Sequence, residues 1–149
     1  MPLRLTPRGF SRALSPLTRG QMKKPNIETV KAVRSLLSDP KRWHKGNYAN
    51  VNWDQPSDLI NQRDNPEACF CLLGAAYACG DIGDDAEFLY ATDSQFNELL
   101  NPCLSHYEQA KDTYGGFWTP AFNDSDATTH EDVLKVLDCT IKRLEGEAT

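Results

Sequence analysis

The sequence predicts an all-α protein, a single small domain of five or six helices with two long aromatic-rich loops. Near both ends of the chain, apolar residues recur at helical spacing. In the middle, residues 68–79 are apolar on nearly every side, which is typical of a buried helix. The length of 149 residues, with 40% hydrophobic and 25% charged residues, fits one globular domain with one core.

The first helix is expected to begin after Asn26, a good N-cap residue, and to end at Asp39-Pro40. Its inward face repeats apolar residues at helical spacing: Ile27, Val30, Val33 and Leu37. Residues 41–65 follow, with Gly46, Pro56 and many Asn and Asp residues but no sustained period. We expect this segment to be mostly loop.

The second helix is predicted to start at Asp64 or Asn65, with Pro66 in its first turn, and to finish before Gly80. Because it is apolar almost all round, it should be the central helix of the fold. The small residues Gly-Ala-Ala at positions 74–76 would let another helix approach closely.

Two helices are expected next, a short one after Asp84-Asp85 and another after Asp93-Ser94. Proline removes a helical hydrogen bond, so we predict a break at Asn101-Pro102 and a fresh start beyond it. Residues 112–126 are rich in turn formers and form the second predicted loop.

The last helix is predicted from a capping box between Thr128 and Glu131. Its apolar residues repeat on one face: Val133, Val136, Leu137, Thr140, Ile141 and Leu144.

Charge divides the chain near residue 24. Residues 1–24 hold six of the 16 basic residues and no acidic residue, which leaves 10 basic against 21 acidic residues from Pro25 onward, a net charge of −11. Residues 1–24 lack a periodic apolar face, so we expect a flexible basic extension, with the helical domain at residues 25–146. An Arg-bearing start without acidic residues resembles a transit peptide or a nucleic-acid-binding arm, and a third interpretation is that residues 1–21 are an upstream extension with no role in the fold. Nucleic acid is expected as a partner only if the extension is a real arm.

The five cysteines are Cys69, Cys71, Cys79, Cys103 and Cys139, an odd number inside apolar patterns. The chain shows no secretory-signal pattern and no apolar run near about 18 residues. We therefore expect free thiols, a cytoplasmic location (the host cytoplasm if phage-encoded) and no membrane. Neither the cysteine spacing nor the loop after Asp124 matches a zinc or calcium site, so no metal or cofactor is expected.

Seven of the 14 aromatic residues, including all three Trp, lie in the two loops. One interpretation is that the rings cover the helices as a second packing layer. The other is a cleft where residues 43–53 touch residues 114–124, which binds a protein partner or a small ligand. The candidate binding residues are Trp43, Tyr48, Trp53, Trp118, Phe122, Asn123, Asp124 and His130.

Three short motifs carry a resemblance. They are a Trp-x-x-Gly turn at residues 43–46, a Cys-x-x-Gly-Ala helix at residues 71–75, and a Phe122-Asn-Asp turn before a capped helix that contains His130. Together they resemble an uncharacterised family of small phage and bacterial proteins over about residues 27–145. Phe122 stands where that family usually has Trp, and an Arg often found near Thr128 is absent. The resemblance implies a phage-linked or prokaryotic accessory protein and no reaction.

Two function classes follow from these observations. The first is a non-enzymatic binding or interaction protein, a phage or prokaryotic accessory factor acting on a host component. The alternative is a cysteine-dependent hydrolase, in which Cys71, His130 and Asn123 supply a Cys/His/Asn constellation. The apolar surroundings of Cys71 and the lack of a Gly-rich oxyanion loop before it argue against the hydrolase. We therefore expect no catalytic thiol, and we expect Cys71 to be buried beside Gly74 and the last helix.

Overall fold

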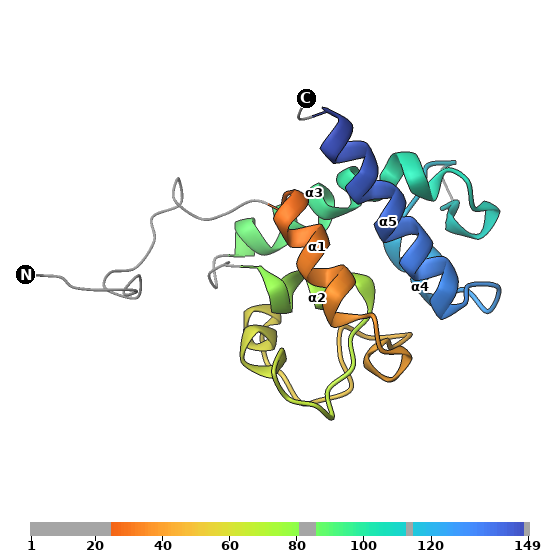
Figure 1. Cartoon of the computed structure of the whole chain (residues 1–149). Helices are drawn as coiled ribbons and strands as arrows, with labels where there is room; N and C mark the ends of the chain where they lie inside the picture. Colours follow the sequence, from red (N-terminus) through yellow and green to blue (C-terminus); the bar gives the residue numbers. More distant parts are fainter. Residues whose placement is uncertain (1–24, 81–85, 113–114, 148–149) are drawn as a thin grey trace, which may run out of the picture.

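The computed structural model describes residues 25–80, 86–112 and 115–147, and Figure 1 shows their arrangement. The basic extension expected at residues 1–24 lies outside this part. The described residues form a single small helical domain without a β-strand, which confirms the predicted fold class. In chain order the helices are α1 (Ile27–Leu36), η3 (Pro40–Arg42), η4 (Pro56–Gln62), α2 (Leu72–Cys79), α3 (Ala86–Leu104), η5 (Glu108–Ala110), α4 (Thr119–Asp124) and α5 (His130–Glu147), where η marks a 3-10 helix.

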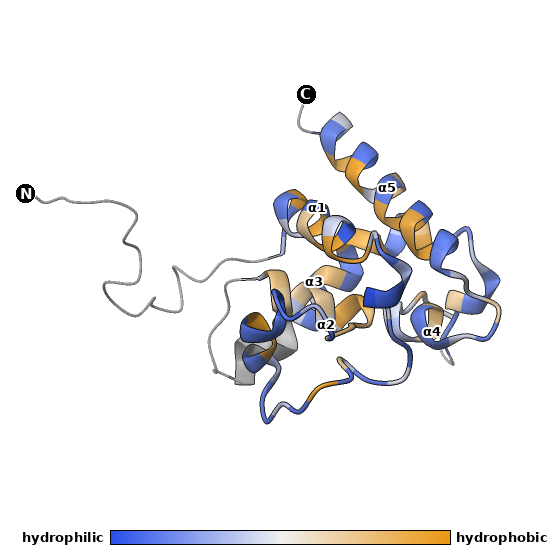
Figure 2. Cartoon of the chain, turned by 60° about the horizontal axis from the view of Figure 1, so that its bottom comes forward, coloured by the Kyte–Doolittle hydropathy of each residue, from blue (hydrophilic) through white to orange (hydrophobic). Residues whose placement is uncertain are grey.

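Helices α1, α3 and α5 form a frame, in which α1 and α3 contact α2 and α5 joins the two. Helix α1 packs against α2 and α5, and α3 packs against α2, α4 and α5. Figure 2 shows hydrophobic and hydrophilic residues alternating along α5, whereas α2 is hydrophobic along its length. Residues 72–78 of α2 are all buried, so the prediction of a central buried helix is confirmed. None of the described helices is both long and apolar enough to cross a membrane.

The first helix has the predicted cap. The Asn26 side chain accepts hydrogen bonds from the backbone N–H groups of Glu28 and Thr29, and the Thr29 hydroxyl accepts one from Asn26 N–H. The last helix begins one residue later than predicted, because its capping box joins Thr129 and Asp132. Thr128 is instead buried, and its hydroxyl accepts a hydrogen bond from the Gln109 amide.

Helix α2 starts at Leu72, so the predicted start at Asp64 or Asn65 was wrong. The backbone before Leu72 pairs with a distant segment: Phe70 N–H donates to Arg42 O, and Cys71 N–H donates to Tyr48 O. Because these amides already have partners, residues 70 and 71 are extended and cannot join the helix. Cys71 becomes the N-cap, and its sulfur accepts a hydrogen bond from Gly74 N–H.

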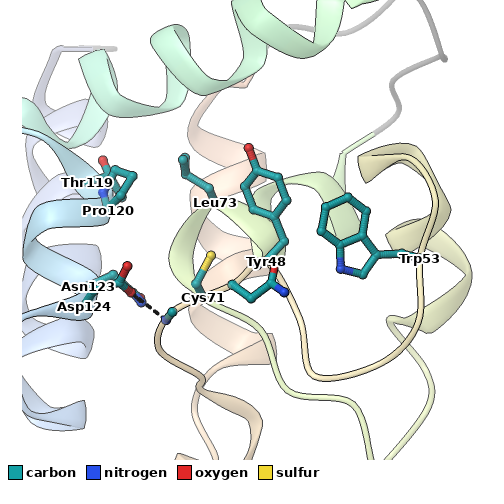
Figure 3. Close-up of a pocket in the computed structure, with 10 residues that line it drawn as sticks. Tyr48, Trp53, Cys71, Leu73, Thr119, Pro120, Asn123 and Asp124 are labelled. Atoms are coloured by element: carbon teal, nitrogen blue, oxygen red, sulfur yellow. Dashed lines mark hydrogen bonds between the residues drawn. The ribbon is translucent and has the colours of Figure 1, made fainter.

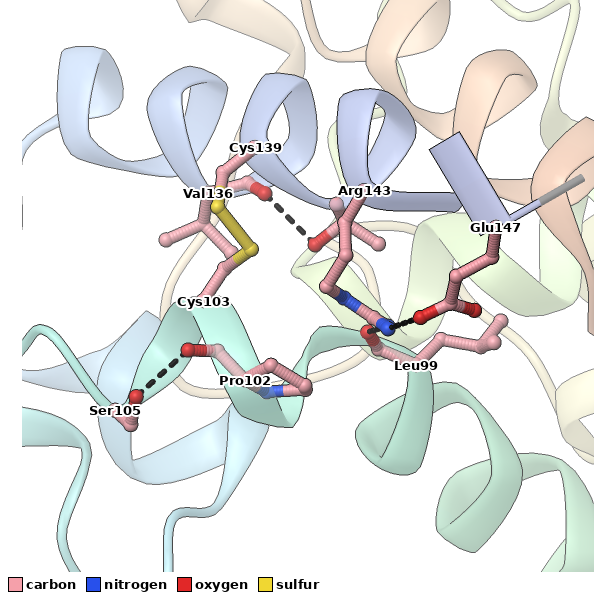
Figure 4. Close-up of a disulfide and its surroundings, with 9 residues drawn as sticks. Leu99, Pro102, Cys103, Ser105, Val136, Cys139, Arg143 and Glu147 are labelled. Carbon is pink, nitrogen blue, oxygen red and sulfur yellow. Dashed lines mark hydrogen bonds and ion pairs between the residues drawn. A yellow bond between two sulfur atoms is a disulfide. The ribbon is translucent and has the colours of Figure 1, made fainter. Parts of the chain in front are cut away.

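Helix α3 is continuous through Pro102, so the predicted separate start at Asp93-Ser94 and break at Asn101-Pro102 were wrong. Pro102 lies in the last turn, and because it has no N–H it removes the helical hydrogen bond to the Glu98 carbonyl without ending the helix. The Leu99 carbonyl, one turn earlier, accepts a hydrogen bond of 2.9 Å from the Arg143 guanidinium of α5 (Figure 4). The two predicted loops also contain short helices, namely η3, η4 and α4.

A disulfide joins Cys103 of α3 to Cys139 of α5 (Figure 4). The expectation of five free thiols was therefore wrong, and Cys69, Cys71 and Cys79 are the free ones. Position 103 follows α3 residues Phe96 and Leu100 on the buried side of that helix, so the bridge lies beside the core. The disulfide weakens one of the grounds on which a cytoplasmic location was expected, namely that all five thiols are free.

Candidate functional site

Asn123 of α4 is the hub that joins the two predicted loops. Its side chain is 1% exposed. The amide oxygen accepts hydrogen bonds from the Trp43 indole N–H (2.8 Å) and from Leu72 N–H (3.0 Å). The amide nitrogen donates to His44 O (3.0 Å) and to Asp124 Oδ1 (2.8 Å). These four bonds use the ordinary donor and acceptor capacity of the amide, so Asn123 holds the site together rather than facing a ligand.

Two further contacts complete the junction between the loops. Gly46 N–H donates to Asp124 Oδ1 (2.9 Å), and the Lys45 ammonium donates to Ser125 O (2.7 Å). Gly46 has a φ of 95°, a left-handed conformation that glycine adopts without strain. The expected contact between the two loops is thus present, and it runs through polar groups around Asn123.

Gly74 receives a loop rather than the helix that the sequence suggested. A Cβ atom at this position would lie 1.9 Å from the carbonyl oxygen of Tyr48, which itself accepts from Cys71 N–H. Any larger residue would collide with that backbone. The glycine therefore lets residues 46–50 lie directly on the start of α2.

Tyr48, Tyr77 and Asp93 form a hydrogen-bonded cluster beside this contact. The Tyr77 hydroxyl donates to Asp93 Oδ1 (2.6 Å) and the Tyr48 hydroxyl donates to Asp93 Oδ2 (3.1 Å). Burial, reinforced by the Asp93 charge, raises the pKa of Tyr48 to about 12 and raises that of Tyr77 as well. Burial also raises the pKa of Asp93, while the two tyrosine hydrogen bonds oppose that rise.

A cavity of about 250 Å³ lies between the 46–53 segment and α4. Figure 3 shows Tyr48 and Trp53 on one side, with Thr119, Pro120, Asn123 and Asp124 on the other. Cys71 and Leu73 of the α2 segment lie between them, and Gly46 and Asn47 complete the lining. The walls are mainly apolar and aromatic, with polar groups at the α4 side.

The structure divides the residues predicted from sequence. Tyr48, Trp53, Asn123 and Asp124 line the cavity. Trp118 does not line the cavity, and its backbone N–H donates to Ala110 O. The other three, Phe122, Trp43 and His130, have packing roles. Phe122 is fully buried against Tyr107. The ring of Trp43 packs at 6.1 Å from that of His130, between centroids. For these rings the interpretation as a second packing layer describes what is seen.

Other cavity residues were missed as binding candidates: Leu73, Thr119 and Pro120. Leu73 and its neighbours gave an all-round apolar pattern, which does not show which side faces a cavity. Tyr77 and Asp93 were also missed. A signal existed for Tyr77, because a tyrosine inside an otherwise apolar helix needs a partner for its hydroxyl.

Cys71 lines the cavity and is partly exposed as a residue, whereas we expected it to be buried, and it does lie beside Gly74. Burial of the sulfur raises its pKa to about 12, although hydrogen bonds from Gly74 and Leu73 oppose the shift. The negative charges of Asp124 and Asp93 raise it further. A nucleophilic cysteine needs the opposite shift, toward the thiolate.

The side chains of His130 and Asn123 form hydrogen bonds with groups other than Cys71. The Nε2 atom of His130 lies 2.6 Å from Leu37 O, and since a carbonyl only accepts, Nε2 carries a proton and donates. The four partners of Asn123 are named above. The geometry therefore gives no support to a Cys71, His130 and Asn123 catalytic set. Among the described residues, no group of three or more His, Cys, Asp or Glu side chains is arranged to hold a metal ion.

The family comparison agrees with the expectation that the chain belongs to an uncharacterised family. Residues 22–143 match the model of a family of unknown function, DUF6197, and the chain belongs to this family. Neither a curated protein nor a solved structure matches the chain. The hub residues Trp43, Leu72 and Asn123 all fall inside the matched range.

Proposed function

We propose that this protein is a non-enzymatic binding protein, with the cavity between the 46–53 segment and α4 as its binding site. The observation that carries the proposal is that the walls are held by hydrogen bonds of the protein itself, centred on Asn123. The cavity is therefore preformed, apolar and aromatic, as ligand sites commonly are. Its one thiol has a raised pKa, which favours binding over catalysis.

The context proposed for this activity is that of a prokaryotic or phage accessory factor acting on a host component. It rests on the motif resemblance, and the acidic body is suited to a basic partner. This context is tested by affinity purification from a host lysate, with the wild-type protein and with a cavity-filling variant. We expect the wild-type protein to retain a host partner that the variant does not retain.

The binding site itself is tested by nuclear magnetic resonance of the ¹⁵N-labelled protein with small neutral, cationic and anionic fragments. We expect at least one class to shift the amide signals of Gly46, Asn47 and Leu73. Pro120→Phe fills the cavity and should abolish the shifts. Pro56→Phe is the matched control, since Pro56 is also a half-buried proline in the first turn of a helix but lies outside the cavity lining. The proposal fails if no fragment moves these signals, or if Pro120→Phe leaves the shifts intact.

A further inference from the structure

The charged lining of the cavity is acidic. Asp124 lines it, and none of the residues that line it is Lys or Arg. Asp124 is exposed, and Oδ1 accepts the two hydrogen bonds described above, from Gly46 N–H and from the Asn123 amide. Within the part of the chain that the structure describes, Oδ2 accepts no hydrogen bond. The same two bonds fix the orientation of the carboxylate.

The opposite wall consists of two aromatic rings. The centroids of Tyr48 and Trp53 are 5.3 Å apart and their planes are inclined by 52°, so the rings form a corner. The Tyr48 hydroxyl donates to the Asp93 carboxylate, which places a second negative charge behind this ring. Hydrogen bonding to an anion polarises the phenol toward its ring, and the face of an electron-rich ring attracts cations.

The Cys71 thiol lies between these walls, and its pKa depends on the same two carboxylates. Burial is the main reason that the pKa of Cys71 is raised, but the charges of Asp124 and Asp93 both add to the rise. A negative potential therefore reaches the cavity between Asp124 and the aromatic corner. It favours a positively charged group at this place.

A neighbouring cationic side chain, that of Lys45, does not line the cavity and has its own partners. The Lys45 ammonium donates to Ser125 O at 2.7 Å and lies 5.3 Å from the centroid of the Trp43 ring. The Lys45 ammonium is thus held by a carbonyl oxygen and an aromatic ring of the protein itself. The cavity offers similar groups, the Asp124 carboxylate and the rings of Tyr48 and Trp53, but no Lys or Arg residue lines it.

We propose that the group recognised in this cavity is an organic ammonium, held between the Asp124 carboxylate and the Tyr48–Trp53 corner with its alkyl part against Leu73 and Pro120. This inference rests on the proposed binding function and adds the chemical class of the ligand. The ammonium is carried either by a small molecule or by a lysine side chain of a partner.

The test compares ligands that differ in charge but little in shape. Choline and its neutral isostere 3,3-dimethylbutan-1-ol represent small molecules, and a short lysine-containing peptide with its acetyl-lysine form represents a partner. Dissociation constants come from the amide shifts of Gly46, Asn47 and Leu73. We expect at least one cation to bind about fivefold to thirtyfold more tightly than its neutral counterpart. Choline alone would indicate a small molecule, and the lysine peptide alone a protein partner.

Asp124→Asn provides the test by mutation, because its amide oxygen can still accept from Gly46 and Asn123. It should remove most of the preference for the cation. Asp126→Asn is the matched control, an exposed residue two positions later with the same loss of charge and no place in the lining. Equal binding of charged and neutral ligands to the wild-type protein would overturn the ammonium inference and leave the binding site standing. If neither these ligands nor any fragment shifts the cavity signals, the proposed function fails as well.

Discussion

The helical frame and the cleft half of the molecule are held together in different ways. The frame, helices α1, α3 and α5, is held by apolar faces that meet in the core and by the disulfide between α3 and α5. The cleft half, residues 40–71 and 112–129, has few regular elements. It is held by hydrogen bonds between residues about 80 positions apart, such as those from Asn123 to Trp43 and His44. The comparison teaches that the frame rests on many interchangeable contacts, while the cleft rests on a few specific ones.

The largest expected effect breaks the frame. Replacing Cys103 and Cys139 by Ala removes a cross-link that spans 36 residues. A disulfide that closes a loop of this size restricts the unfolded chain and thereby stabilises the folded protein by about 3–4 kcal/mol. Urea unfolding followed by far-ultraviolet circular dichroism measures the loss. Dithiothreitol should destabilise the wild-type protein and leave the double variant unaffected, and equal midpoints for the two proteins would contradict the prediction.

The next effect separates the cleft segment from the frame. In Gly74→Ala, the added methyl group would overlap the Tyr48 carbonyl, and we expect a loss of about 3 kcal/mol because backbone cannot easily move away. Gly146→Ala is the control, because Gly146 also lies in an α-helix and a Cβ there meets open space. It should be neutral or stabilise by up to about 1 kcal/mol. Similar denaturation midpoints for the two variants would refute the argument.

A smaller effect is confined to the cleft half. Asn123→Ala leaves the Trp43 indole, Leu72 N–H and His44 O without their partner, at a cost of about 2 kcal/mol. All three Trp residues lie in the cleft half, so their fluorescence follows this region while circular dichroism follows the helices. We expect the fluorescence transition in urea to move to lower concentration than the helical one. Asn52→Ala, at an exposed position of the cleft half outside the cavity lining, should move neither. Coincident transitions in Asn123→Ala would mean that the halves unfold as one.

A pH-dependent effect is expected at the Cys71 thiol, which belongs to the cleft half. Its pKa is about 12 in the folded protein, against about 8.5 for an unperturbed thiol. Since the folded-state pKa is raised, this contribution to stability is fully present below about pH 8.5 and is lost as pH rises toward 12. At pH 8, iodoacetamide should modify Cys71 at least about 100-fold more slowly in the folded protein than in urea. Rapid modification of folded Cys71, followed by peptide mass spectrometry, would instead revive the hydrolase hypothesis.

The smallest effect is expected from removing residues 1–21. They carry no periodic apolar face, and the family match begins at residue 22. We expect the thermal midpoint to change little, by the equivalent of less than about 0.5 kcal/mol. If the segment binds nucleic acid, the shortened protein would lose a salt-sensitive affinity for it while keeping its midpoint. A large fall in the midpoint would show that the segment contributes to the core.

The sequence by itself determined the helical class, the start of α1, most of α5 and the central position of α2. These features depend on apolar spacing and capping groups within a few residues of one another, as with Asn26 and Thr29. It also drew attention to Tyr48, Trp53 and Asp124, because aromatic and polar residues gather in the two loops.

Only the tertiary structure decided the start of α2, the pairing of Cys103 with Cys139 and the role of Asn123. The backbone of Phe70 is extended because Arg42 supplies its partner, and nothing within residues 64–71 specifies that partner. In the same way, Asn123 is a hub because Trp43, His44 and Leu72 meet it from other parts of the chain. A local pattern can predict a helix, since its hydrogen bonds join neighbours in sequence. It cannot predict contacts between residues 50 to 80 positions apart, because these exist only when the packed frame brings the segments together.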